Sequence, residues 1–385
     1  MRIATILIGL AAPLPVAAQD HGTAGGDALA TTIEVPFESH DGYAMLGKLT
    51  VPADDADHPL LVYVQTAEGM TVDMRRPLRE GRTFDYMDLY RERLPPLGFA
   101  FFSYEGRGVR MGDAPPRYET IDRAVYDTST LENKVRDALA AIEVAARQPG
   151  VDAERLFLIG ASEGSLLAAE TATRAGDRVR GLVLYSILAS TLQDATRYMA
   201  GDGAFNQMND LFDTNRDGGT SREEYEADAR GYRKAALGSI TFEQLDENGD
   251  GVFAAADLRA LRKPLLDAID SKNAEPVYQW LALTAAVSLP KGWLEDHFAH
   301  PPMWSFLARL DIPVAVLHGT ADNLTPVAGT RELEAIVTAA EKTNIEFHYF
   351  DGLDHSLGLA RYFAAGAPLP AGHEAILQFL RKHAR

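Results

Sequence analysis

The stretch RLFLIGASEGSLL, residues 155–167, decides the fold of this chain. Its first part, 156–159, is a continuous apolar run, which is typical of a strand buried on both faces of a sheet. Its second part begins a segment, 162–174, that favours a helix. The pentapeptide Gly160-Ala161-Ser162-Glu163-Gly164 joins them and has the form G-x-S-x-G. The pentapeptide alone is a weak signal, but a strand, a sharp turn and a helix in this order predict that Ser162 is an exposed nucleophile.

The chemistry of a serine nucleophile explains the two glycines. A serine on a sharp strand-to-helix turn has a strained backbone, and neighbouring chain segments approach it closely, so Cβ atoms at Gly160 and Gly164 would clash. The helix N-terminus that follows supplies N–H groups and the positive end of a dipole beside a developing oxyanion. Ser162 as a simple helix N-cap is the alternative, because serine is also favoured there.

Apolar runs and helical periodicities alternate along much of the chain, which predicts an α/β fold with a mainly parallel sheet and helices on both faces. The expected strands are 32–38, 43–51, 60–65, 99–104, 155–159, 181–188, 313–317 and 345–350, and the expected helices are 84–93, 131–147, 162–174, 329–341 and 373–382. The alternation stops at about residue 190 and resumes at about 311. We therefore expect a core formed by 32–190 and 311–385, and a helical cap inserted at 191–310.

A serine hydroxyl needs a base and a group that orients the base. Asp322 follows the predicted strand 313–317, and His355 follows the predicted strand 345–350. Both are therefore expected at the carboxyl ends of strands, like Ser162. Of the other candidates, His318 fits a buried structural histidine, and Asp354 is adjacent to His355 in the chain, where side chains point apart. His297 and His300 lie in the insertion, where contact with a substrate is the alternative to packing.

An oxyanion hole needs one N–H from Glu163, the residue after the nucleophile. A second N–H is expected from the loop after the strand 60–65, with Ala67 or Thr66 as the donor.

The elbow, the Asp322 and His355 loops, and Tyr104-Glu105-Gly106-Arg107-Gly108 resemble the α/β-hydrolase superfamily. They are most similar to its esterase and serine-aminopeptidase-like branch, where Ser-Glu-Gly elbows recur. The resemblance covers residues 32–190 and 305–385, and the order serine, aspartate, histidine is the order of its triad. It implies hydrolysis of an ester, thioester or amide through an acyl-enzyme. The chain departs from its relatives at the oxyanion loop, where Gln65-Thr66-Ala67 replaces their His-Gly or Gly-Ser-Gly.

The insertion contains a twelve-residue segment, 213–224, that matches the calcium loop of an EF-hand. Oxygen-bearing side chains occupy alternate positions, and Gly218 takes the position of the sharp turn. This alternation turns every second side chain inward, as a hard cation with six to eight oxygen ligands requires. The expected Ca²⁺ ligands are Asp213, Asn215, Asp217, the carbonyl of Gly219, Ser221 and Glu224.

A second loop, 246–257, begins 33 residues later, and two matches in tandem predict an EF-hand pair within about 203–262 rather than acidic turns. Its expected ligands are Asp246, Asn248, Asp250, the carbonyl of Val252 and Asp257. Ala254 offers no side-chain oxygen at position 9, and Asp257 is one methylene shorter than glutamate. We expect this site to bind Ca²⁺ more weakly. A structural clamp on the cap is favoured over a sensor, and the weaker second site keeps the sensor alternative open.

The first residues, 1–18, have a short basic start, an apolar run and small residues before Gln19, which is the pattern of a signal peptide. Residues 19–31 are expected to be a flexible leader. The apolar run is too short to span a bilayer, and the absence of cysteine excludes disulfides, a thiolate nucleophile and a lipid-anchor cysteine. We expect a periplasmic or secreted protein with no stable membrane anchor.

The chain of 385 residues has 55 acidic and 37 basic side chains, a net charge of −18, which disfavours a nucleic-acid partner. Residues 209–258 hold 12 acidic and 5 basic side chains, so −7 of this charge lies around the two loops. The leading hypothesis is a serine hydrolase acting on a small carboxylic ester. A peptidase or amidase of the same fold, or a non-catalytic calcium-dependent binding protein, is the alternative. A dehalogenase or epoxide hydrolase is disfavoured because the elbow carries serine.

Overall fold

The computed structural model describes residues 29–78, 81–238, 240–284, 289–365 and 367–384. An eight-stranded sheet runs through it in the order β1-β2-β6-β3-β9-β10-β13-β14. The first two pairings, β1 with β2 and β2 with β6, are antiparallel, and the others are parallel. The strands are β1 (Ala30–Glu38), β2 (Ala44–Pro52), β3 (His58–Tyr63), β6 (Ala100–Tyr104), β9 (Val151–Ala161), β10 (Val179–Tyr185), β13 (Val314–Gly319) and β14 (Ile345–Phe350).

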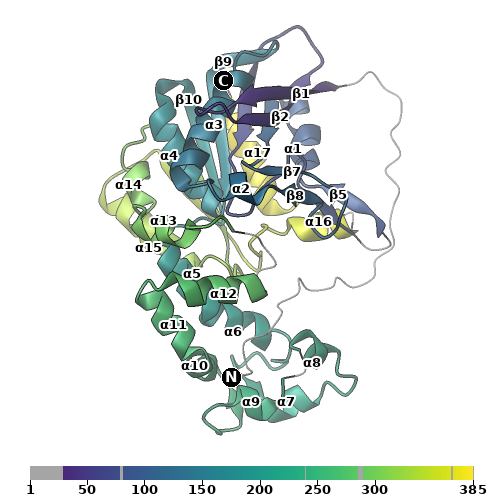
Figure 1. The fold of residues 1–385 in the computed structure, drawn as a ribbon, viewed down its shortest axis with the longest axis vertical. Coiled ribbons are helices and arrows are strands. Elements are labelled where there is room, and N and C mark those ends of the chain that lie inside the picture. The colour runs from purple at the N-terminus through teal and green to yellow at the C-terminus, as the bar shows by residue number, and fades with distance from the viewer. Residues whose placement is uncertain (1–28, 79–80, 239, 285–288, 366, 385) are drawn as a thin grey trace.

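Helices cover both faces of this sheet (Figure 1). Successive side chains of a strand point to opposite faces. Accordingly, Leu60 and Leu158 pack with α3 and α4, whereas Leu61 and Phe157 pack with α1 and α17. The helices of the core are α1 (Asp88–Arg93), α2 (Arg123–Tyr126), α3 (Leu131–Ala145), α4 (Glu163–Ala175), α15 (Val327–Ala339), α16 (Leu359–Ala365) and α17 (Ala371–His383), with 3₁₀ turns η2 (Pro95–Leu97) and η3 (Gly176–Arg178).

A long insertion separates β10 from β13. Its last two helices contact the core, α13 against α3 and α14 against α4, whereas the middle of the insertion extends away from the sheet (Figure 1). Its elements are α5 (Leu192–Ala200), α6 (Asp202–Asn209), β11 (Thr220–Ser221), α7 (Arg222–Glu226), α8 (Tyr232–Ala236), α9 (Phe242–Leu245), β12 (Val252–Phe253), α10 (Ala255–Leu261), α11 (Lys263–Asp270), α12 (Ala274–Thr284), α13 (Trp293–Ala299) and α14 (Trp304–Leu307).

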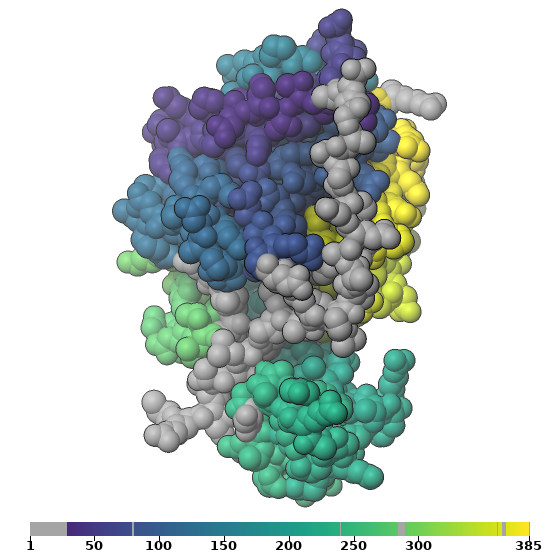
Figure 2. Space-filling view, turned by 90° about the vertical axis from the view of Figure 1, so that its right-hand side faces the viewer, coloured from purple at the N-terminus to yellow at the C-terminus, as the bar shows by residue number. Residues whose placement is uncertain are grey.

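The middle of the insertion has a hydrophobic core of its own, which includes Phe212, Tyr225, Phe242 and Phe253. The rings of Phe212 and Tyr225 lie 4.9 Å apart between centroids. In the space-filling view this teal segment forms a distinct lobe at the lower end of the molecule (Figure 2). The lobe is therefore held together by its own aromatic residues, and α6 and α10 connect it to the rest of the insertion.

Two segments differ in kind from the elements expected for them. Strand β1 begins at Ala30, inside the segment expected to be a flexible leader, because Ala30 and Thr31 pair with Pro52 and Val51. The expected helix 84–93 is a strand followed by a shorter helix, since β5 (Thr83–Asp85) pairs with β4 (Arg75–Pro77) and α1 begins only at Asp88. A second small hairpin pairs β7 (Val109–Met111) with β8 (Glu119–Ile121). The predicted signal peptide lies outside the described residues.

None of the helices within the described ranges is both long enough and apolar enough to cross a bilayer.

Candidate active site

Ser162 occupies a strained turn between β9 and α4. Its backbone angles are φ 54° and ψ −128°, an unusual conformation for a residue with a side chain. A Cβ atom at Gly160 would lie 2.1 Å from the carbonyl oxygen of Gly164, and one at Gly164 would lie 2.7 Å from that of Gln65. Both glycines are thus required by close backbone contacts. The Ser162 side chain makes no capping hydrogen bond to α4, so the N-cap alternative has no support in the geometry.

Asp322 and His355 come together at the carboxyl end of the sheet. Nδ1 of His355 lies 2.8 Å from Oδ2 of Asp322. Asp322 is buried, and Oδ1 accepts hydrogen bonds from the backbone N–H groups of Leu324 at 2.8 Å and Thr325 at 2.9 Å. These bonds fix the carboxylate, and the carboxylate in turn fixes the imidazole ring. Because an ionised carboxylate only accepts, Nδ1 carries the proton and Nε2 is left as a base.

The electrostatics of this pair suit a general base. Burial would raise the pKa of Asp322, but His355 and His318 beside it outweigh burial and hold the pKa well below its ordinary value of 3.8. Burial likewise lowers the pKa of His355, and the Asp322 carboxylate outweighs it, so the net pKa lies above 6.5. The His355 side chain keeps 25% of its surface exposed, which leaves it open to a substrate.

The strand ends hold the serine and histidine loops together. The N–H of Ser162 donates to the carbonyl of Tyr185 at 3.2 Å, and Oγ of Ser186 donates to the carbonyl of His355 at 2.7 Å. Tyr185 is the last residue of β10 and Ser186 follows it directly, so the end of this strand links both loops. Within the described ranges no hydrogen bond joins the Ser162 hydroxyl to His355. Such catalytic bonds are often long without a substrate and tighten in its complex.

The other candidate residues have structural partners. His318 is fully buried between Oγ1 of Thr330, 2.8 Å from Nδ1, and the carbonyl of Thr325, 3.1 Å from Nε2. Asp354 accepts hydrogen bonds from Ser356 and Gly358 and stabilises its own turn.

The two histidines of the insertion bind carboxylates on α4. Nε2 of His297 lies 2.6 Å from Glu163, and Nε2 of His300 lies 2.9 Å from Glu170. Their ring nitrogens therefore dock the insertion on the core, and this geometry gives the alternative of substrate contact no support.

The loop after β3 leaves backbone donors free beside the elbow. The N–H of Met70 donates to Oε1 of Gln65 at 3.3 Å, and that of Gly69 donates to the hydroxyl of Tyr126 at 3.2 Å. The N–H groups of Thr66 and Ala67 have no partner among the described residues, and neither has that of Glu163 at the start of α4. These are the three groups that the sequence singles out as candidate oxyanion donors.

Sequence reasoning missed the side chains that surround Glu163. Lys134, Trp293 and His297 all donate hydrogen bonds to its carboxylate. One signal for this cluster was available: Lys134 lies three residues after Leu131 and four before Ala138, on the apolar face of α3. A charged residue on such a face usually has a buried partner of opposite charge.

The two loops of the insertion share one hydrogen-bond pattern. The first-position carboxylates, Asp213 and Asp246, accept from the N–H groups of Gly218 at 3.1 Å and Gly251 at 3.0 Å. The last-position carboxylates behave alike as well: Glu224 accepts from Asn215 N–H at 3.2 Å, and Asp257 accepts from Asn248 N–H at 3.2 Å. Strands β11 and β12 pair antiparallel and join the loops, with Thr220 opposite Phe253.

The donor set of each loop suits a hard cation, because all the expected ligands are oxygens. In the described residues, however, no three acidic or histidine side chains converge on a common point. Oε2 of Glu224 accepts from Ser221, from its N–H at 3.0 Å and its hydroxyl at 2.8 Å. Its other oxygen, Oε1, faces the loop and accepts from the N–H groups of Thr214 at 3.0 Å and Asn215 at 3.2 Å. The expected ligands Asp217, Gly219, Asp250 and Val252 lie on the same two loops.

Comparison with known proteins identifies the fold. No protein-family model matches the chain, and no curated protein sequence matches it either. A hypothetical protein from Pseudomonas aeruginosa is similar in structure, with a TM-score of 0.51 and 14% identity over 96% of this chain and 100% of the other. An acylaminoacyl peptidase from Pyrococcus horikoshii has a TM-score of 0.51 and 13% identity, over 93% of this chain and 42% of the other. An α/β hydrolase from a Penicillium species has a TM-score of 0.49 and 15% identity, over 92% and 99%.

The chain has the α/β-hydrolase fold, with a mostly parallel central sheet and helices on both faces. At these identities the similarity concerns the fold alone.

Proposed function

We propose that the protein is a serine hydrolase that cleaves carboxylic esters through an acyl-enzyme. The observation that carries this proposal is the 2.8 Å contact between His355 Nδ1 and Asp322 Oδ2, at the same end of the sheet as the strained Ser162. A base whose other nitrogen is held by a buried carboxylate is what a serine nucleophile requires.

The steps follow from these positions. Nε2 of His355 takes the hydroxyl proton as Oγ of Ser162 attacks the ester carbonyl, and Asp322 stabilises the imidazolium that forms. The oxyanion accepts hydrogen bonds from the N–H of Glu163 and from that of Ala67 or Thr66. The tetrahedral intermediate collapses, the C–O bond to the leaving group breaks, and His355 returns the proton to the departing alcohol. Water, activated by His355, then hydrolyses the acyl-enzyme and frees Ser162.

A matched pair of substrates tests this function. 4-Nitrophenyl acetate and 4-nitroacetanilide carry the same acyl group on an ester and on an amide. The proposal expects turnover of the ester, its loss in Ser162→Ala, and slow or absent turnover of the anilide. A faster reaction with the anilide would replace the esterase by a peptidase or amidase. No turnover of either, together with retained calcium binding, would favour a non-catalytic binding protein.

We further propose that the two loops hold Ca²⁺ and that the protein works in the periplasm or outside the cell. Asp213, Asn215, Asp217, Gly219, Ser221 and Glu224 would hold the first ion, and Asp246, Asn248, Asp250, Val252 and Asp257 the second, more weakly. The matching hydrogen bonds of the loops and the pairing of β11 with β12 support this proposal. Bound calcium would supply charge compensation that holds the acidic lobe together.

A further inference from the structure

The carboxylate of Glu163 is buried directly behind the proposed nucleophile, where three parts of the chain meet. Its Oε2 accepts a hydrogen bond from Nζ of Lys134, on α3, at 2.7 Å. Its Oε1 accepts from Nε1 of Trp293 and from Nε2 of His297, both on α13, at 2.6 Å each. Glu163 and Lys134 are 2% and 6% exposed, so this is an ion pair shielded from water.

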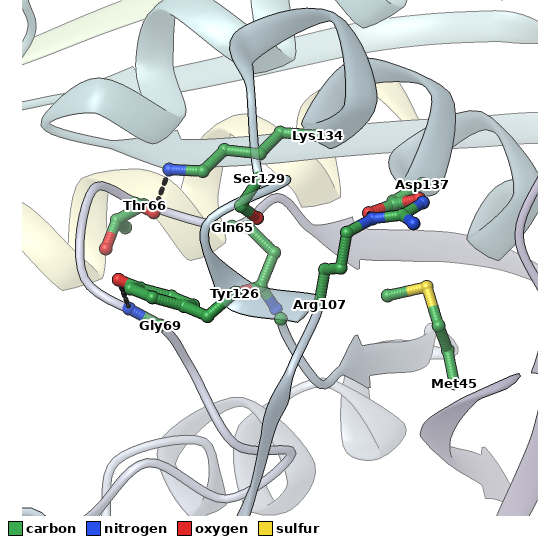
Figure 3. A pocket seen from close by; sticks show the side chains of 10 residues that line it. Met45, Gln65, Thr66, Gly69, Arg107, Tyr126, Ser129, Lys134 and Asp137 are labelled. Carbon is green, nitrogen blue, oxygen red and sulfur yellow. Dashed lines mark hydrogen bonds and ion pairs between the residues drawn. The ribbon is translucent and has the colours of Figure 1, made fainter. Parts of the chain in front are cut away.

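The Lys134 ammonium has a second partner on the loop after β3. Nζ donates to the carbonyl oxygen of Thr66 at 3.1 Å, a contact drawn as a dashed line in Figure 3. Thr66 and Ala67 carry the free N–H groups proposed as one half of the oxyanion hole, and Glu163 carries the other half. One ammonium group therefore ties together the two segments whose spacing would decide how an oxyanion is bound.

Packing alone does not account for this arrangement. Burying two charges costs several kcal/mol, and an apolar pair of similar volume would fill the space at least as well. A cavity of about 10 Å³ also adjoins Lys134, lined among others by Gln65, Thr66 and Ser129 (Figure 3). The Lys134 ammonium is held by hydrogen bonds to Glu163 at 2.7 Å and to the carbonyl of Thr66 at 3.1 Å.

We propose that Lys134 and Glu163 are positioning residues that fix the distance between the two halves of the oxyanion hole. This inference rests on the proposed function. The Lys134 bond to Thr66 restrains the loop after β3 from outside, in addition to the bond that Gln65 accepts from Met70 within it. Trp293 and His297 bind the other oxygen of the Glu163 carboxylate. The docking of α13 on the core therefore contributes to the same restraint.

The restraint by Lys134 and Glu163 has its effect in the transition state. Negative charge develops on the carbonyl oxygen only as the tetrahedral intermediate forms, and the N–H donors stabilise it only if they already point at it. A loop that drifts by a fraction of an ångström weakens this contact but leaves substrate binding largely intact. Loss of this restraint is therefore expected to lower kcat and to leave KM nearly unchanged.

The decisive variant is the double substitution Lys134→Met with Glu163→Gln. It removes both charges, so that neither is left buried without a partner. Glu170→Gln is the matched control: Glu170 lies two turns further along α4, binds His300 of the insertion at 2.9 Å and does not contact the loop after β3. The readouts are kcat and KM for 4-nitrophenyl acetate, the inhibition constant of a trifluoromethyl ketone that forms a tetrahedral adduct, and the midpoint of urea unfolding.

We expect the double variant to unfold near the wild-type midpoint, with kcat reduced about 10- to 100-fold. KM should change by less than about threefold, and the ketone should bind more weakly by the same factor as kcat. The Glu170→Gln control should keep wild-type kcat. If the double variant does not fold, Lys134→Arg takes its place, since it keeps the charge but presents a planar group to Thr66, and the same joint loss of kcat and ketone affinity is expected.

Kinetics of the double variant equal to those of the control would overturn the positioning role and leave the proposed hydrolase intact. A loss of kcat that parallels a loss of stability in every variant would likewise show that Lys134 and Glu163 have only a structural role. A wild-type protein that neither turns over the ester nor binds the ketone would overturn the proposed function and this inference with it.

Discussion

The hydroxyl of Tyr198 donates a hydrogen bond to the backbone carbonyl of Asp322, with 3.1 Å between the two oxygens. Tyr198 lies on α5, at the start of the insertion, and Asp322 carries the carboxylate that binds His355. The next helix, α6, begins against the same loop, because a Cβ atom at Gly203 would lie 2.4 Å from the carbonyl oxygen of Asn323. The insertion is thus attached directly to the loop that orients the proposed base.

Removing this hydroxyl should weaken the attachment without disturbing the core. We expect Tyr198→Phe to lower the free energy of unfolding by about 1 kcal/mol, the usual contribution of one such hydrogen bond. Ester hydrolysis should fall only a few-fold. Tyr232→Phe is the control, since Tyr232 is 72% exposed. Urea unfolding of both variants checks the prediction, and equal midpoints would show that the bond does not contribute to stability.

Asp322→Asn tests the orientation of the base. We expect kcat to fall by about three to four orders of magnitude, as in serine proteases that lose the corresponding carboxylate. The pH profile should change as well. Hydrolysis needs neutral His355, whose pKa lies above 6.5 because Asp322 outweighs burial, so activity should rise as the pH increases through that pKa. Without the carboxylate, this rise in activity should move to lower pH. A rise in activity at the same pH as in the wild type would contradict the role of Asp322 as the group that orients His355.

The Glu163 carboxylate should stabilise the fold in a pH-dependent way. Burial alone would raise its pKa, but Lys134 and His297 outweigh burial and hold the pKa at about 2, against an ordinary value of 4.5. Its contribution is therefore complete above pH 4.5 and is lost as the pH falls toward 2. We expect Glu163→Gln to cost about 3 kcal/mol at pH 7 and progressively less below pH 4.5. A cost that is constant with pH, measured by urea unfolding, would contradict this.

Calcium should stabilise the lobe of the insertion. We expect two binding sites in a calorimetric titration of the wild type, the second weaker, and loss of the stronger one in Asp213→Ala. Chelator should lower the unfolding temperature, since a ligand bound only to the folded state stabilises it. Because α6 joins the lobe to the Asp322 loop, ester hydrolysis should fall as well. Identical unfolding and activity curves with calcium and with chelator would remove the proposal.

The sequence predicted best those features that depend on a local pattern of residues. The alternation of apolar runs and helices predicted the α/β fold, and the G-x-S-x-G pattern predicted a sharp turn at Ser162, where φ is 54° and both glycines are in close backbone contact. The positions of Asp322 and His355 after strands predicted that they would lie at one end of the sheet, and their side chains are in contact.

What the sequence did not reveal depends on contacts between distant segments. The strand β5 within the expected helix 84–93 forms because Arg75 pairs with Asp85, at 2.7 Å between Nε and Oδ1. The cluster at Glu163 joins α3, α4 and α13, and its contacting residues Glu163 and His297 are 134 positions apart in the chain. Periodicity assigned Lys134 to the buried face of α3, but its partners follow only from the way the insertion packs on the core.

Reaction of the intact protein with a fluorophosphonate, followed by intact mass and peptide mapping, tests directly whether Ser162 is a nucleophile. We expect one covalent adduct for each chain, located on Ser162, absent from Ser162→Ala and absent after heat unfolding of the wild type. A wild-type chain that gains no mass, or an adduct that persists in Ser162→Ala, would contradict this expectation.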